Sequence, residues 1–222
     1  MGFNIAIDGP AGAGKSTIAK RVSKELNFIY VDTGAMYRAI AVYMLENKIN
    51  IQDSEAIREA CGKISVTIGY ENGEQQVYLN GRNVTRLLRT EEVSQTASVT
   101  SANPHVRAAL LDLQRELAAK EDVLMDGRDI GTHVLPDAEL KIYLTASVKT
   151  RAKRRFLEQQ ARGEACSLDE IAADIEERDA RDMSREIAPL KQAEDAIFLD
   201  SSDMTIDEVV EAIKKQYEEV RR

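Results

Sequence analysis

A run of small residues between a short apolar segment and a helix-forming one constrains the fold most strongly. The apolar segment "FNIAID" starts at Phe3, and "GPAGAGKST" follows it directly at residues 9–17. This run matches G-x-x-x-x-G-K-[ST] in the strand–loop–helix context that the pattern requires, which argues against a chance glycine-rich turn. Gly9, Gly12 and Gly14 allow consecutive N–H groups to turn inward, and the helix adds its positive end. The sequence therefore predicts a phosphate-binding loop after the first strand.

Four further apolar segments, rich in β-branched residues, predict four more buried strands. They are "FIYVD" from Phe28, "VLMD" from Val123, "LKIYLT" from Leu140 and "AIFLD" from Ala196. Helix-like segments separate most of them, and this alternation favours an α/β fold with a five-stranded parallel sheet flanked by helices. Four of the five strands end on an aspartate, and ligands bind outside the carboxyl ends of such strands. We therefore expect several of these aspartates to point at the active site: Asp8, Asp32, Asp126 and Asp200.

One region interrupts the α/β alternation. Residues 63–85 contain two Asn-Gly pairs between alternating apolar residues, which predicts a small antiparallel β insert with tight turns. A helical pattern follows over residues 90–120, with Pro104 separating two helices. The last helix begins with a capping box formed by Thr205 and Glu208.

The strand ends narrow the class of phosphate-loop protein. A GTPase switch carries an Asn-Lys-x-Asp motif, but the nearest string, "NKIN" at Asn47, ends on Asn50. A hydrolysing motor has a second acid at a strand end, whereas Gly127 follows Asp126 here and Ser201 follows Asp200. A kinase of small molecules is therefore the leading class.

Charge and cysteine content indicate what kinds of partner and which compartment to expect. The net charge of −8 argues against a general nucleic-acid binder, so arginines must be concentrated locally to hold an anionic ligand. The chain contains no apolar run of about 20 residues and no recognisable secretory signal. Its two widely separated cysteines, Cys61 and Cys166, fit reduced thiols. We expect a cytoplasmic protein, monomeric by default, that binds neither membrane nor nucleic acid.

Four blocks of sequence then resemble one family. These blocks are "VDTGAMYR" from Val31, "RTEEVSQTASVTSANPHVR" from Arg89, "MDGRDIGTHVLPDA" from Met125 and "RDARDMSREIAPL" from Arg178. Together with the loop and the β insert they are similar to bacterial cytidylate kinases. The resemblance implies transfer of a phosphoryl group from ATP to CMP or dCMP. It also implies a single nucleoside monophosphate kinase domain with a core (1–33, 120–150, 186–222), a monophosphate-binding lobe (34–119) and a helical lid (151–185).

The resemblance also implies an acceptor site. Arg38 and Arg128 resemble the family's monophosphate clamp, a task that suits the bidentate guanidinium group. For the base, a carboxylate accepts from the N4 amino group of cytosine, whereas uracil would oppose it with O4. Arg107 could instead form a structural salt bridge. The complete set of expected CMP-binding residues is Asp32, Thr33, Tyr37, Arg38, Ser98, Arg107, Arg128, Asp129, Arg178, Asp182 and Arg185.

The donor side is expected to combine the loop with arginines. The ATP-binding residues would be Gly9, Pro10, Ala11, Gly12, Ala13, Gly14, Lys15, Ser16, Thr17, Arg151 and Arg155. Lys15 would reach the β- and γ-phosphates, and the Ser16 hydroxyl would ligate Mg²⁺. Transfer would depend on five cationic side chains: Lys15, Arg128, Arg178, Arg181 and Arg185.

Residues 178–185 leave an alternative open. Arg178, Arg181, Asp182 and Arg185 fall at i, i+3, i+4 and i+7, which would place them on one helix face. A solvated face with Arg178 paired to Asp182 would use the same pattern. Crowded like charges repel unless an anion lies opposite, so we favour a lid clamp over the transferring phosphoryl group. The remaining alternatives for the whole chain are a UMP kinase and a non-catalytic nucleotide sensor.

Overall fold

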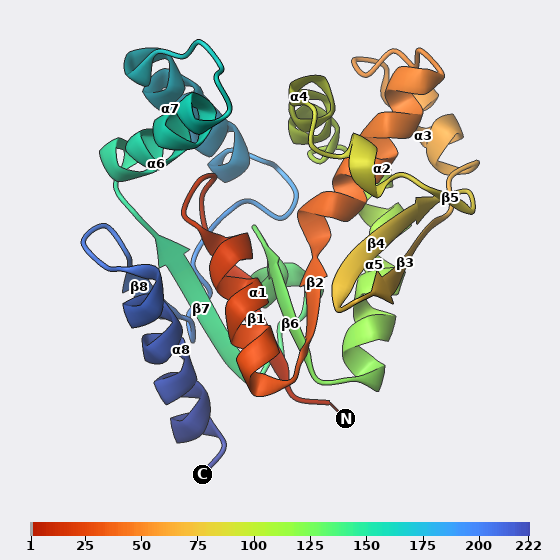
Figure 1. The fold of residues 1–222 in the computed structure, drawn as a ribbon. Coiled ribbons are helices and arrows are strands. Elements are labelled where there is room, and N and C mark those ends of the chain that lie inside the picture. Colours follow the sequence, from red (N-terminus) through yellow and green to blue (C-terminus); the bar gives the residue numbers. More distant parts are fainter. Residues whose placement is uncertain (1) are drawn as a thin grey trace. The chain divides into compact units, whose positions relative to one another are not determined.

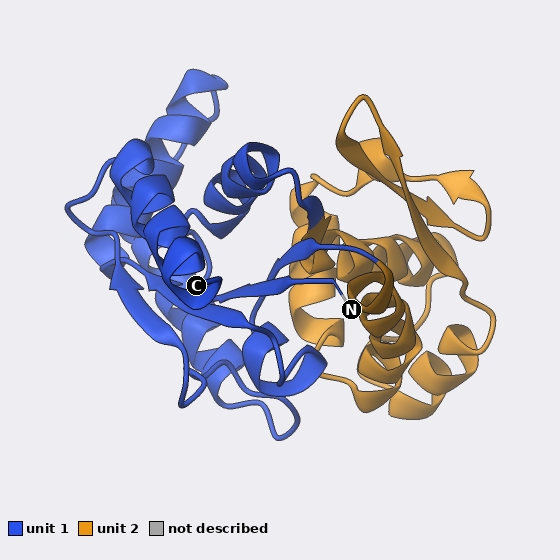
Figure 2. Ribbon diagram, turned by 90° about the horizontal axis from the view of Figure 1, so that it is seen from below, with its two compact units in different colours: residues 1–30, 121–222 blue, residues 31–120 orange. Residues whose placement is uncertain are grey.

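The computed structural model describes residues 2–222, which divide into two compact units (Figure 2). Among the described residues, the first unit comprises 2–30 and 121–222, and the second comprises Val31–Lys120. Each unit has a hydrophobic core of its own. Within residues 2–222, no helix is both long and apolar enough to cross a membrane.

A five-stranded parallel sheet with the order β2-β6-β1-β7-β8 forms the centre of the first unit (Figure 1). The strands are β1 (Asn4–Asp8), β2 (Ile29–Asp32), β6 (Val123–Gly127), β7 (Leu140–Thr145) and β8 (Ile197–Asp200). Ile5 and Ile7 of the central strand β1 are fully buried, as expected where both faces of a parallel sheet are covered. All five predicted strands are confirmed. β6 continues one residue past Asp126, and β2 extends across the boundary between the units.

Four helices and one turn complete the first unit: α1 (Lys15–Leu26), η2 (Ile130–Val134), α6 (Val148–Ala161), α7 (Leu168–Met183) and α8 (Ile206–Val220). α1 and α8 lie side by side against the sheet (Figure 1), and Ile18, Val22 and Ile213 join the core cluster of the strands. The predicted Thr205/Glu208 capping box is confirmed at the start of α8.

α6 and α7 have a small core separate from that of the sheet. Ala152 of α6 packs with Ile171 and Ile175 of α7, and Phe156 borders this cluster. Two helices with their own apolar contact can move as one body, so this pair suits the predicted lid. The division into core, lobe and lid within a single domain stays a prediction.

The second unit carries the predicted β insert. Its elements are α2 (Thr33–Glu46), α3 (Ser54–Cys61), β3 (Val66–Glu71), β4 (Glu74–Leu79), β5 (Arg82–Asn83), η1 (Thr85–Leu87), α4 (Glu91–Thr100) and α5 (Pro104–Lys120). β3, β4 and β5 form an antiparallel sheet, as the two Asn-Gly pairs predict. Asn72–Gly73 and Asn80–Gly81 all have positive φ, which these residue types adopt readily. The predicted break between two helices is also confirmed, because α5 begins at Pro104.

Candidate active site

The loop after β1 has the backbone conformation that its glycines suggested. Gly9 has φ 151°, and a Cβ there would lie 1.9 Å from the Leu144 carbonyl oxygen. Gly14, with φ 86°, is the N-cap of α1. Only glycine adopts these conformations without strain, so the sequence fixes the loop locally.

Lys15 begins α1 and turns back over the loop. Its side chain is 6% exposed, and Nζ donates to the Pro10 carbonyl at 2.7 Å. Burial lowers the pKa of Lys15 well below its ordinary value, and the neighbouring positive charges of Arg128 and Arg178 lower it further. Three cationic side chains thus act on one another near the loop, an arrangement that favours a multiply charged anion.

Ser16 and Asp126 place two oxygen atoms together beside the loop. The Ser16 hydroxyl donates to Asp126 Oδ2 at 2.9 Å, and the Tyr30 hydroxyl donates to Oδ1 at 2.9 Å. A hydroxyl next to a carboxylate suits Mg²⁺, which binds few protein oxygens and keeps several waters. Among residues 2–222, no group of three or more His, Cys, Asp or Glu side chains could hold a metal ion. This pair therefore fits a magnesium ion shared with a nucleotide better than a dedicated protein cage.

Asp8 is a buried acid at the end of β1. Its carboxylate accepts from the backbone N–H groups of Ile130 (2.8 Å) and Gly131 (2.7 Å). Burial raises its pKa to about 7; the two N–H donors lower it, Asp129 raises it, and Lys15 lowers it. Asp8 thus links the strand before the loop to the turn that follows Arg128 and Asp129.

Asp182 joins two of the predicted phosphate-binding arginines. It is 1% exposed, accepts from Arg128 Nε at 2.8 Å and forms an ion pair with Arg185. Burial raises its pKa, but the charges of Arg128, Arg185 and Arg178 and the hydrogen bond from Arg128 together hold the pKa below its ordinary value. Asp182 thus pairs with Arg128 and Arg185, and the charge of Arg178 also lowers its pKa.

The expectation that residues 178–185 share one helix face is wrong for Arg185. α7 ends at Met183, and beyond it the Leu190 N–H bonds back to the Asp182 carbonyl at 2.9 Å. Arg185 reaches Asp182 from beyond the helix end. Arg181 stays on the helix and pairs with the more exposed Glu177 at 2.5 Å, as a solvated face would.

Arg151 is buried and held in place by several bonds. It is 4% exposed and donates to the carbonyls of Ala146 and Ala11, both at 2.8 Å. It also pairs with Asp179 of α7 at 2.7 Å, and Asp179 in turn accepts from the Ala11 N–H at 3.3 Å. Arg151 thus ties α6 and α7 to the loop, and its expected role with ATP stays a prediction.

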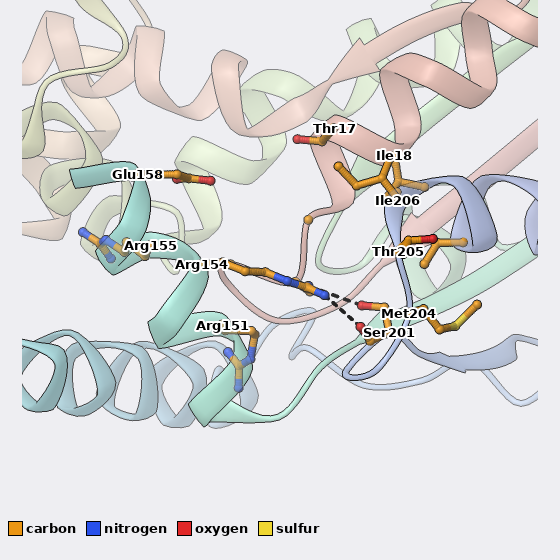
Figure 3. A pocket seen from close by; sticks show the side chains of 14 residues that line it. Thr17, Ile18, Arg151, Arg154, Arg155, Glu158, Ser201, Met204, Thr205 and Ile206 are labelled. Atoms are coloured by element: carbon orange, nitrogen blue, oxygen red, sulfur yellow. Dashed lines mark hydrogen bonds between the residues drawn. The ribbon is translucent and has the colours of Figure 1, made fainter. Parts of the chain in front are cut away.

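A cavity of about 390 Å³ opens beside the loop (Figure 3). Gly12, Gly14 and Thr17 line one side, and the arginines of α6 face the segment between β8 and α8. Arg154 points across the cavity and donates to the Ser201 carbonyl at 2.8 Å (Figure 3). The cavity is continuous with the loop, so a group attached to a loop-bound phosphate can enter it.

In the second unit, Asp32 organises the start of α2. Its carboxylate accepts from Ala35 N at 2.8 Å and pairs with Arg38 at 3.0 Å. Gln75 of β4 holds the backbone of Asp32 at both ends, because it accepts from the N–H at 2.8 Å and donates to the carbonyl at 3.2 Å. Thr33, the next residue, is buried. The β insert therefore supports the residue that orients Arg38.

The predicted base-reading residues divide between the units. Ser98 and Arg107 are buried in the second unit, where Arg107 donates to the Ser101 carbonyl at 3.3 Å and lies 5.7 Å from the Tyr37 ring centroid. Asp129 is buried in the first unit. Their convergence on one base stays a prediction.

Comparison with known proteins extends this picture along the chain. The family model described as cytidylate kinase matches residues 5–219. This chain belongs to the cytidylate kinase family. A cytidylate kinase from Lactobacillus gasseri is 52% identical over 213 residues, which cover 96% of this chain and 93% of that protein. One from Exiguobacterium sp. is 48% identical over 219 residues, which cover 99% and 98%.

A solved structure supports the fold independently. An uncharacterized protein from Eubacterium ventriosum aligns over 96% of this chain and 97% of its own length, with a TM-score of 0.51. At 14% identity this likeness concerns the fold alone. The resemblance seen in the four sequence blocks is confirmed by the family match.

Four residues of this chain that contact the loop, the cavity or the Arg128 turn were given no specific role from the sequence. Asp8 ends β1 and Asp126 is the second-last residue of β6, and their positions in the sequence predicted only that they point at the active site. Arg154 stands between two arginines that were named, in "TRAKRR". Asp179 gave no sequence signal of its own, because its role depends on the buried Arg151.

Proposed function

We propose that this chain transfers the γ-phosphoryl group of ATP to CMP or dCMP, giving ADP and CDP or dCDP. The observation that carries the proposal is the crowding of Lys15, Arg128 and Arg178 beside the phosphate loop. Like charges repel one another unless anions offset them. Asp126 and Asp8 offset part of the charge around Lys15, and two phosphate-bearing substrates would supply more negative charge. Membership of the cytidylate kinase family supports CMP as the acceptor.

The donor would occupy the loop and the adjoining cavity. The backbone N–H groups of residues 9–17 and the positive end of α1 suit the phosphates, and the cavity has room for the nucleoside. Arg154 and Arg155 line the cavity, while Arg151 holds the loop itself. When bound, Mg²⁺ would neutralise phosphate charge, and Ser16 and Asp126 would hold it.

The acceptor-binding residues are assigned from the resemblance to the family. Arg38 and Arg128 would bind its phosphate, Ser98, Arg107 and Asp129 would read cytosine, and Arg178 and Asp182 would meet the sugar. Asp32, Thr33 and Tyr37 would complete the site near Arg38, and Arg185 would act through Asp182 and on the phosphoryl group.

Transfer needs no general base, because the second pKa of a phosphate monoester is near 6 and the acceptor is largely dianionic at neutral pH. Lys15 and the arginines would stabilise the charge of an in-line transition state. Closure of α6 and α7 would exclude water, which would otherwise make the protein an ATPase. A cytoplasmic monomer that acts on two small nucleotides completes the proposal.

An acceptor panel tests this function. Purified protein with ATP and Mg²⁺ is assayed for ADP production with CMP, dCMP, UMP, AMP, GMP and dTMP. We expect turnover to be strongest with CMP and dCMP. Preference for UMP would keep the kinase but contradict the base assignment. ATP binding without turnover of any monophosphate would make the protein a sensor instead.

A further inference from the structure

The turn that carries Arg128 and Asp129 is held at two points by side chains outside it. On one side lies Asp8, whose carboxylate accepts the first two N–H groups of η2, from Ile130 and Gly131. β1 pairs with β6 in the register Asp8 to Gly127, so the two strand ends lie beside each other. Asp8, at the end of β1, therefore caps the helical turn that follows the neighbouring strand β6.

On the other side lies Lys141 of β7. Its Nζ donates to the Pro136 carbonyl and to both carboxylate oxygens of Asp195, at 2.9 and 2.7 Å. Its aliphatic part packs on Gly131, where an added Cβ would lie 3.1 Å from Lys141 Cδ and 3.4 Å from Asp8 Oδ2. Gly131 is thus enclosed between the two side chains, with no room for a methyl group unless they shift.

Both charged groups are buried, Asp8 to 5% and Lys141 to 7% exposure. Burying such a group is costly unless it finds partners: Asp8 accepts from the N–H groups of Ile130 and Gly131, and Lys141 pairs with Asp195 and donates to the Pro136 carbonyl. Asp129 is joined to the segment of residues 130–136, because its carbonyl accepts from the N–H groups of His133 at 2.9 Å and Val134 at 3.1 Å, and Arg128 directly precedes it. A displacement of the segment would therefore move the guanidinium group.

We propose that Asp8 and Lys141 are positioning residues that clamp residues 130–136 and thereby set the places of Arg128 and Asp129 for the acceptor nucleotide. The inference rests on the proposed function, since it gives these two residues their roles toward phosphate and base. Neither clamp residue needs to touch a substrate. Small misplacements of groups that orient a substrate reduce its binding and turnover markedly.

Three substitutions test the clamp in different ways. Asp8→Asn keeps the size of the side chain but opposes one N–H donor with an amide NH₂. Lys141→Met keeps much of the stem on Gly131 and removes the bonds to Pro136 and Asp195. Gly131→Ala leaves both clamp residues in place and pushes them apart by a few tenths of an ångström.

Lys214→Met is the matched control. Lys214 is also an ion-paired lysine of the first unit, bonded at 2.8 Å to Glu25 and to Glu211, but it lies on α8 among surface residues. For each variant we would measure kcat and both KM values, the kcat/KM ratio of CMP over UMP, and the melting temperature.

We expect each clamp variant to raise KM for CMP about tenfold, the size of one lost charge-assisted hydrogen bond. KM for ATP should stay within about twofold, the CMP-over-UMP ratio should fall, and Lys214→Met should match wild type. Unchanged CMP kinetics in the folded clamp variants would overturn the inference. So would a parallel change in both KM values, or failure of all three variants to fold, because either result assigns the residues to stability alone.

Failure of the proposed function is distinguishable from failure of the clamp. If wild type phosphorylates another monophosphate, the function is wrong, and the same KM comparison with that acceptor decides the clamp. If wild type phosphorylates CMP but the variants behave like the control, only the clamp is wrong.

Discussion

The phosphate loop and the turn after Arg128 follow two paired strands, β1 and β6, yet the chain holds them in different ways. The loop takes its conformation chiefly from its own residues, through the positive φ of Gly9 and Gly14 and the bond from Lys15 to Pro10, although distant residues bond to its Ala11. The turn depends on residues far along the chain. Asp8 and Lys141 hold its backbone, and Asp182 holds Arg128.

In the proposed function, this difference separates phosphate binding, which the loop carries, from recognition of the acceptor, which the turn carries. A loop whose backbone conformation is set chiefly by its own glycines suits the part common to many phosphate-binding proteins. A turn whose geometry depends on several distant side chains can be adjusted to one acceptor. Changes in the loop should therefore affect rate, and changes around the turn should affect acceptor affinity and choice.

The largest effect is expected from Lys15→Ala. Removing the cation from the loop should lower kcat by about three orders of magnitude, because it stabilises charge in transfer. The fold should survive, because the bond from Lys15 to the Pro10 carbonyl lies within the loop. Steady-state ADP production and a melting curve would be compared with Lys24→Ala, an exposed lysine of the same helix. Near-normal turnover would contradict the assignment of the loop.

Arg178→Ala should slow transfer by about two orders of magnitude, because this charge acts on the same site as Lys15. The control is Arg162→Ala, which removes an arginine that is 62% exposed and paired with Glu164. Single-turnover rates with CMP and dCMP are the measurement. If both rates stay at the wild-type level, the solvated-face interpretation of residues 178–185 is correct and the lid-clamp interpretation is wrong.

The raised pKa of Asp8 predicts that the free energy of unfolding depends on pH. The pKa of Asp8 is about 7 in the folded protein and 3.8 ordinarily. Between pH 3.8 and about pH 7, folded Asp8 therefore keeps a proton that the unfolded chain has released. The stability that protonated Asp8 contributes is full below about pH 4 and is lost as the pH rises through 7. The free energy of unfolding, relative to Asp8→Asn, should fall by about 2 to 3 kcal/mol from pH 5 to pH 8. Urea titrations across this range measure it, and a constant difference would show that Asp8 ionises normally.

Asp129→Ala should reduce the preference for CMP over UMP by about tenfold, with a smaller effect on the rate with CMP. The loss of the carboxylate removes both an acceptor for the cytosine amino group and a repulsion toward uracil O4. Asp137→Ala, in the exposed part of the same segment, is the control. An unchanged ratio of kcat/KM values would remove Asp129 from base recognition.

The sequence predicted the parts whose causes are local. The loop, the five strands, the Asn-Gly turns of the β insert and the Thr205/Glu208 capping box each depend on neighbouring residues, and all are confirmed. Arg185 was placed wrongly because α7 ends at Met183, an end that no short pattern encodes. Arg151 and Asp179 belong together only through folding, so their pairing could not be predicted.

The most direct test of the central claim is the stoichiometry of the products. Wild-type protein with ATP, Mg²⁺ and CMP would be sampled over time, and ADP, CDP and inorganic phosphate would be separated and quantified. The account predicts equal amounts of ADP and CDP with almost no inorganic phosphate. ADP accompanied by phosphate instead of CDP would show that water is the acceptor, and would contradict the proposed transfer.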